Sequence, residues 1–231
     1  MFRKTLASWF FFTSCLVIAN AQSDTSSIQR KSFAVSAGIG VSLVDATGVV
    51  DYVNDFVNYQ SVSSTKQDDF ATAVEFFGSA EVQVSESWGM KAEYSYLLKT
   101  YEIPQVGASP FSFSYGVHMP LLMVQYLIPE KGYTVKFGGG LGYHLAHFVK
   151  DASFYGSDEY TSTGVGIKLE AEANTEFDEH LYGLISVEVR GAVMGEFKDS
   201  QGNFMVDPVR QKDATMSFFS IGTKFGLIYY L

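Results

Sequence analysis

The chain has 231 residues and a formal net charge of −9, with 25 acidic and 16 basic side chains. This acidic balance argues against nucleic acid as a partner, because binding to phosphates needs clustered Lys and Arg. Aromatic residues make up 16% of the chain, a fraction typical of membrane proteins with aromatic belts at both interfaces.

The first 21 residues have the three parts of a secretory signal peptide. Arg3 and Lys4 form a basic start, an apolar run follows, and residues 19–21 read Ala-Asn-Ala, an A-x-A cleavage site. The run is shorter than the ~20 apolar residues of a membrane helix, which favours cleavage over an uncleaved anchor. The sequence therefore predicts a signal peptide over residues 1–21 and a mature domain over 22–231.

Removal of the signal changes both the charge and the cysteine content. Loss of Arg3 and Lys4 takes the net charge from −9 to −11. The only cysteine, Cys15, lies inside the predicted signal, so neither a disulfide nor a thiolate metal site is expected in the mature chain. No later segment reaches the ~18 consecutive apolar residues of a transmembrane helix.

Apolar and polar residues alternate with a period of two along the mature chain, which is the pattern of half-buried β-strands. In the fourth segment both faces are apolar and Pro120 interrupts the run. Proline cannot donate a hydrogen bond to a neighbouring strand, so a bulge or irregular pairing is expected there. The predicted strands are 32–43, 72–84, 88–101, 112–127, 133–147, 161–175, 181–194 and 216–231.

The connections between these strands are alternately long and short, as in outer-membrane barrels with long outside loops and short periplasmic turns. The sequence therefore predicts an all-β fold, an eight-stranded antiparallel up-and-down transmembrane β-barrel with strands from about 32 to 231. The long connections are 44–71, 102–111, 148–160 and 195–215, and the short ones are 85–87, 129–132 and 176–180.

Twelve charged residues fall on the polar faces of the predicted strands, where they would point into the barrel lumen. An eight-stranded barrel is just wide enough for side chains to fill it, so this set of six acids and six bases predicts a charge-balanced structural plug. The alternative is a path for ions or protons. The twelve residues are Glu75, Glu81, Lys91, Glu93, Lys99, Lys136, Lys168, Glu170, Glu172, Glu188, Arg190 and Lys224.

The first long connection carries apolar residues at helical spacing: Val49, Val53, Phe56 and Val57. One hypothesis is a short amphipathic helix that caps the barrel mouth or meets a partner. The other is an ordinary outside loop that packs on its own rim.

Residue types that carry chemistry are few. A lipid hydrolase would need a Ser–His pair near the bilayer edge, and His144 and His147 lie near Ser153 and Ser157. However, the two histidines fall on opposite faces of one strand, and no spacing selects a triad. The glycine run 138–142 lacks the Gly-Lys-Ser/Thr of a phosphate loop and is interpreted as room for large neighbours. No catalytic residue, cofactor or metal site is predicted.

The chain ends with apolar residues at every second position: Phe225, Leu227, Tyr229 and Leu231. With the signal and the eight strands, this ending resembles the small OmpA/OmpX-type outer-membrane barrels, although Leu231 stands where that family usually has Phe. The resemblance implies insertion into the outer membrane of a Gram-negative bacterium by the barrel-assembly machinery, with the terminal strand as the assembly signal. It also implies lipid and lipopolysaccharide as neighbours.

The function expected from these features is a structural or surface-interaction role, carried by the outside loops of a monomeric barrel. An alternative is a narrow porin-like channel for small or apolar solutes, similar to OmpW. A lipid-modifying enzyme is the least favoured interpretation.

Overall fold

The computed structural model describes residues 33–59, 70–105, 108–152 and 156–231. The predicted signal peptide lies outside these ranges. Within them, no helix combines the length and the apolar character that a membrane crossing requires. The elements are β1 (Phe33–Asp45), α2 (Thr47–Tyr59), β2 (Phe70–Gln83), β3 (Trp88–Gln105), β4 (Ala108–Glu130), β5 (Tyr133–Ala152), β6 (Gly156–Glu176), β7 (Leu181–Met194) and β8 (Phe218–Tyr230).

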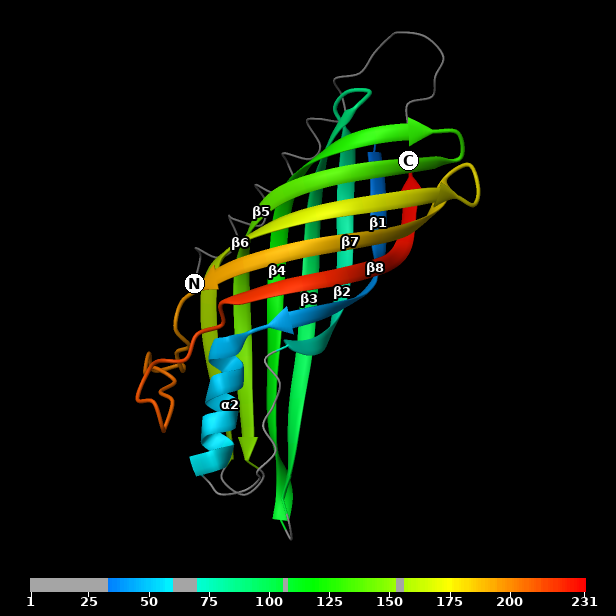
Figure 1. Ribbon diagram of the computed structural model, residues 1–231. Helices are drawn as coiled ribbons and strands as arrows, with labels where there is room; N and C mark the ends of the chain where they lie inside the picture. Colours follow the sequence, from blue (N-terminus) through cyan, green and yellow to red (C-terminus); the bar gives the residue numbers. More distant parts are fainter. Residues whose placement is uncertain (1–32, 60–69, 106–107, 153–155) are drawn as a thin grey trace, which may run out of the picture. The chain divides into compact units, whose positions relative to one another are not determined.

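The eight strands form one closed antiparallel barrel in chain order (Figure 1). Each strand pairs with the next, and β1 pairs with β8 from Ala34↔Tyr230 to Asp45↔Phe219. The predicted all-β fold class and the up-and-down order are confirmed. Short turns join β2 to β3, β4 to β5 and β6 to β7 at one end, named here the short-turn end. Helix α2 and the segment 195–217 lie at the other, the long-loop end.

Strand pleating sends successive side chains to opposite faces, so the alternating sequence gives two different barrel surfaces. The outward positions hold large apolar side chains that are close to half exposed or more, such as Ile39, Phe76, Leu141 and Val193. The inward positions of the same strands hold buried polar and charged side chains, such as Glu75 and Lys168. The barrel is therefore apolar outside and polar inside, the reverse of a soluble β-barrel.

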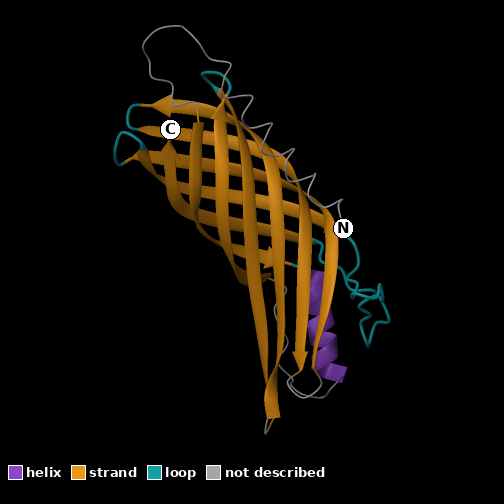
Figure 2. Cartoon of the chain, turned by 180° about the vertical axis from the view of Figure 1, so that it is seen from behind, coloured by secondary structure: helices purple, strands orange, loops and turns teal. Residues whose placement is uncertain are grey.

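Strands β3 to β6 extend well past the barrel at the long-loop end, where they form a four-stranded sheet (Figure 2). The prediction that residues 102–111 and 148–160 are long loops is therefore wrong, since most of these residues belong to strands. The physical reason is burial: the inward side chains of Ile103, Phe113 and Phe148 are at most 2% exposed, so pairing continues to support a core there.

The same core explains why β4 is apolar on both faces. Its outward residues, such as Leu122 and Val124, are exposed on the barrel, whereas the inward residues Phe113 and Val117 are fully buried. At Pro120 the expected irregularity takes the form of a gap. Residues 119 and 120 have no partners on β5, while the register on either side of the gap is unchanged.

The glycine run of β5 makes room for the inward side chains of β4. A Cβ on Gly138 would lie 3.0 Å from Cγ of Gln125, and one on Gly140 would lie 2.5 Å from Cγ of Met123. A Cβ atom at either distance would force the neighbouring side chain to move. At Gly140 the Cα atom of Met123 would also lie only 2.9 Å from the added Cβ, and a backbone atom cannot easily move away. The glycines are therefore positions of close packing.

Candidate functional site

The segment with helical spacing in the sequence forms helix α2, which follows β1 after a single residue. Its first turn is closed by hydrogen bonds from the backbone N–H groups of Val49 and Val50 to the carbonyl of Ala46. Val49, Val53 and Val57 are at most 3% exposed, and Phe56 is partly buried. An isolated 13-residue helix is marginal in water, so this burial, worth roughly 1.5–3 kcal/mol per side chain, holds it in place.

Helix α2 shares one apolar core with the inner faces of the strand extension and with residues 195–217. Aromatic rings carry much of this contact: the ring of Tyr52 meets Phe148 edge-on at 5.8 Å, and Phe56 meets Phe111 and Phe113 in the same way. From the last connection, Phe197 and Met205 are buried in the same core. Of the two hypotheses for this segment, the amphipathic helix that covers the barrel mouth agrees with the structure, and the ordinary loop does not.

The last connection also holds α2 through charges. The guanidinium of Arg210 forms ion pairs with Asp51 and, at 2.8 Å, with Asp55 on the next turn. Burial and the neighbouring Asp207 raise the pKa of Asp55, while Arg210 lowers it. We call this arrangement the Arg210 clamp.

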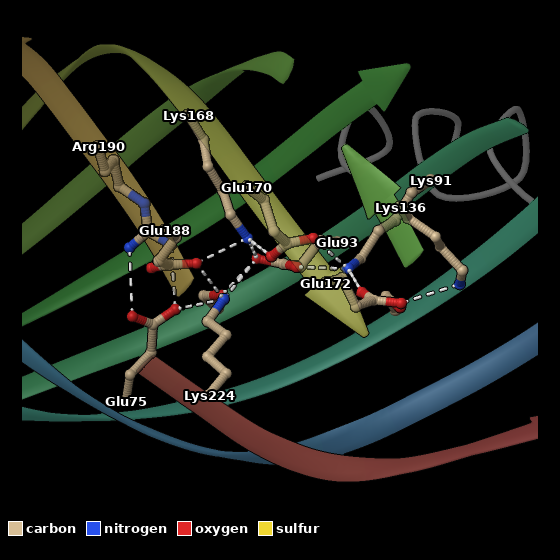
Figure 3. A network of polar contacts seen from close by, with 12 residues as sticks. Glu75, Lys91, Glu93, Lys136, Lys168, Glu170, Glu172, Glu188, Arg190 and Lys224 are labelled. Atoms are coloured by element: carbon tan, nitrogen blue, oxygen red, sulfur yellow. Dashed lines mark hydrogen bonds and ion pairs between the residues drawn. The ribbon is translucent and has the colours of Figure 1, made fainter. Parts of the chain in front are cut away.

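Below this apolar core, the lumen is filled by a continuous network of ion pairs (Figure 3). At the short-turn end, Lys136 bonds to Glu81 and, at 2.9 Å, to Glu172. The ammonium of Lys91 lies 2.7 Å from carboxylate oxygens of both Glu172 and Glu170. All of these side chains are at most 9% exposed.

The network continues toward the long-loop end through Glu170, which Lys91 and Lys168 share, and Glu188, which Lys168 and Arg190 share. The ammonium of Lys168 contacts Glu170 at 2.6 Å, Glu93 at 2.7 Å and Glu188 at 2.8 Å. Arg190 then contacts Glu188 at 2.8 Å and Glu75 at 3.1 Å. The guanidinium of Arg190 also approaches Sδ of Met119 at 3.0 Å, which is where the charged network meets the apolar core.

Three carboxylates from β2, β3 and β7 converge in the middle of the lumen. Oxygens of Glu75, Glu93 and Glu188 lie within 4.8 Å of one another, and among the described residues this is the one group that could hold a metal ion. The ammonium of Lys224 occupies that position, at 2.9, 2.7 and 3.0 Å from the three carboxylates. A lysine thus serves here as the cation.

Eleven of the twelve predicted lumen charges belong to this network, and Lys99 does not. Lys99 is only half-buried, and its ammonium lies 5.0 Å from the ring centre of Tyr101 in the apolar part of β3. It is six residues beyond Glu93, which is about 20 Å along a strand. The lumen network therefore holds six acids and five bases, with one negative charge in excess, and the predicted balance of six and six is wrong.

The histidines considered for catalysis do not share a site. His144 points inward, is fully buried and stacks on Phe218 at 6.0 Å, whereas His147 faces outward at 3.9 Å from Glu159. Ser157 lies on β6, and Ser153 falls outside the described residues.

A small cavity of about 130 Å³ lies at the short-turn end. Lys136, Glu81 and Gln125 line it, so its inner wall is the first ion pair of the network.

Neither the protein-family models nor the curated sequences compared with this chain give a match. The comparison with solved structures does give matches. Neisserial surface protein A aligns with a TM-score of 0.53 at 9% identity, over 86% of this chain and 97% of that one. A major outer membrane protein from Thermus thermophilus aligns with a TM-score of 0.50 at 13% identity, over 85% and 98%. The chain has the fold of the small outer-membrane β-barrels.

This fold and the apolar outward surface together confirm the expected location in a bacterial outer membrane. Three residues of the predicted assembly signal, Phe225, Leu227 and Tyr229, lie on the outward surface of the last strand and are about half exposed. Leu231 directly follows that strand and is 67% exposed. Recognition of this signal by the assembly machinery stays a prediction.

Substitution of Lys224 by Met is expected to destabilise the barrel, because three buried carboxylates would lose the cation that they share and keep only Lys168 and Arg190 as close partners. Breaking a buried charge network costs about 3–5 kcal/mol, which would appear as a lower urea midpoint for unfolding of the refolded protein. Lys99→Met is the matched control, since Lys99 also faces inward but lies outside the network. Equal midpoints for the two variants would contradict a central role for Lys224.

Substitution of Arg210 by Gln is expected to loosen helix α2 while the barrel stays folded, because the clamp is lost and the transmembrane strands are untouched. The measurement is amide hydrogen exchange, which should become several-fold faster in residues 47–59 than in wild type. Lys212→Gln, an exposed change in the same connection, is the control. Unchanged exchange in the Arg210 variant would show that apolar packing alone holds the helix.

Proposed function

We propose that the protein is a non-conducting outer-membrane barrel that presents a rigid, ordered platform at the cell surface for contact with other molecules. The observation that supports this most directly is the double filling of the lumen, first by the ion-pair network and then by the apolar core under α2. On this proposal the barrel acts as a monomer, the barrel-assembly machinery inserts it, and it carries no catalytic or cofactor role.

The contacts among the described residues of the long-loop end support a surface role. Residues 195–217 are held by backbone bridges to β6 and to themselves, such as Thr161↔Lys198 and Val206↔Asp213. Together with the Arg210 clamp and the strand extension, they give a fixed surface. A fixed surface binds a partner without the entropic cost of ordering loops.

The channel alternative has less support. The apolar inward face of β4 offers no free surface to an apolar solute, because it is covered by α2 and belongs to the core. The cavity at the short-turn end meets the Glu81–Lys136 pair. A solute would have to break the ion pairs and move the helix to cross.

Planar-bilayer recording separates the two functions. Pure refolded protein is expected to give no stable single-channel steps, because a path for hydrated ions would require breaking buried ion pairs. A variant with residues 47–59 replaced by a Gly/Ser linker of equal length is also expected to give no conductance steps, since the ion-pair network alone fills the lumen. Regular conductance steps from the wild-type protein would favour the channel.

The surface role requires that the long-loop end faces outward from the cell. A cysteine introduced at Ser200 should react on intact cells with a maleimide that cannot cross membranes, because the mature chain is expected to have no other cysteine. A cysteine at Lys131, in a short turn, should react only after the outer membrane is permeabilised. The reverse pattern would place the platform in the periplasm and remove the proposed role.

A further inference from the structure

The outward surface of β3 to β6 shows where the bilayer ends. On β3 the outward side chains are apolar or aromatic from Trp88 to Leu98, and then become Thr100 and Glu102. On β6 the apolar series ends at Val165, and Thr163 follows. The apolar part of β3 covers about the 9–11 residues that a tilted strand needs to cross the hydrocarbon layer, so these positions mark its outer edge.

A histidine faces outward at this edge. His118 on β4 is followed toward the short-turn end by the exposed outward residues Leu122 and Val124. Toward the long-loop end come Gly116 and Ser114. A polar ring in this position would be costly in hydrocarbon, and so it belongs at the level of the lipid headgroups.

Two tyrosines from β3 fix the His118 ring. The hydroxyl of Tyr94 lies 2.6 Å from Nδ1 of His118, and the ring of Tyr96 stacks on the imidazole at 4.5 Å with an angle of 25° between the planes. A phenol donates readily, so its O–H on Nδ1 leaves the proton of neutral His118 on Nε2. Among the described residues nothing hydrogen-bonds Nε2, which leaves an N–H donor for a ligand.

The backbone beside the histidine is shaped for this arrangement. The ring of Tyr96 crosses over Gly116, where a Cβ would lie 2.5 Å from the Tyr96 hydroxyl and 3.0 Å from its ring. Any larger residue at this position would displace the ring that supports His118. The cluster of Tyr94, Tyr96 and His118 is therefore a packed unit on the lipid-facing surface.

We propose that this cluster binds the phosphate of a membrane lipid in the outer leaflet. The acyl chains would lie on the apolar surface below, beside Leu122 and Leu145, and the phosphate would accept the hydrogen bond from Nε2 of His118. The occupant is a lipid because the site is continuous with the surface that the bilayer covers. A phosphate oxygen is the strongest acceptor at headgroup depth, since hydrogen bonds to charged groups exceed neutral ones.

The test is native mass spectrometry of the folded barrel, released from detergent with dioleoyl phosphatidic acid or with dioleoylglycerol, which has the same chains and no phosphate. Wild-type protein should retain one phosphatidic acid about tenfold more than dioleoylglycerol, the ratio that one hydrogen bond to a charged group gives. His118→Leu should abolish this preference. Tyr94→Phe, which removes only a hydroxyl, should reduce it severalfold.

Tyr143→Phe is the matched control, because Tyr143 is an equally exposed outward tyrosine on β5 and should leave retention unchanged. A heat-dependent shift on SDS gels verifies that each variant is folded. Equal retention of the two lipids by wild type, or an unchanged preference in both cluster variants, would overturn the proposal. Displacement of the lipid by inorganic phosphate would also overturn it, because the site would then recognise the free anion.

Discussion

A barrel of eight strands has room inside only for side chains, so the charges buried in its lumen must be paired with opposite charges from other strands. Lys224 shows how this constraint is met: its ammonium lies within 3.0 Å of three carboxylates from three different strands. Six of the eight strands contribute charges to the network. The pairing register of the whole barrel is thereby tied to the positions of a few lysines and glutamates.

The same constraint accounts for the layered interior. Charged groups fill the part of the lumen that the bilayer surrounds, and Arg190 ends this layer against Met119. Beyond it the interior becomes apolar, and here the barrel needs a cover that the strands alone cannot supply. Helix α2 provides this cover, and the extended strands β3 to β6 provide the wall on which it packs.

On the proposed non-conducting role, the function of the barrel lies on its outer surfaces. Among the described residues, two such surfaces are held by specific contacts: the part of the long-loop end where the Arg210 clamp joins α2 to the last connection, and the lipid-facing edge at His118. They differ in chemistry, since the first is directed to the aqueous phase and the second to the bilayer. One barrel can therefore contact the membrane and an outside partner through separate residues.

The sequence by itself determined the eight strands with their inward and outward faces, because a period of two follows directly from strand geometry. For Val49 to Val57 the helical spacing offered a helix as one of two hypotheses, and the packing of the tertiary structure decided for it. Only the tertiary structure decided which charges meet. Alternation gives a face but no register, so it could not exclude Lys99 from the network or bring Glu75, Glu93 and Glu188 around Lys224. Likewise, the extension of β3 to β6 depends on burial under α2, and the His118 cluster depends on which residues of β3 lie beside β4.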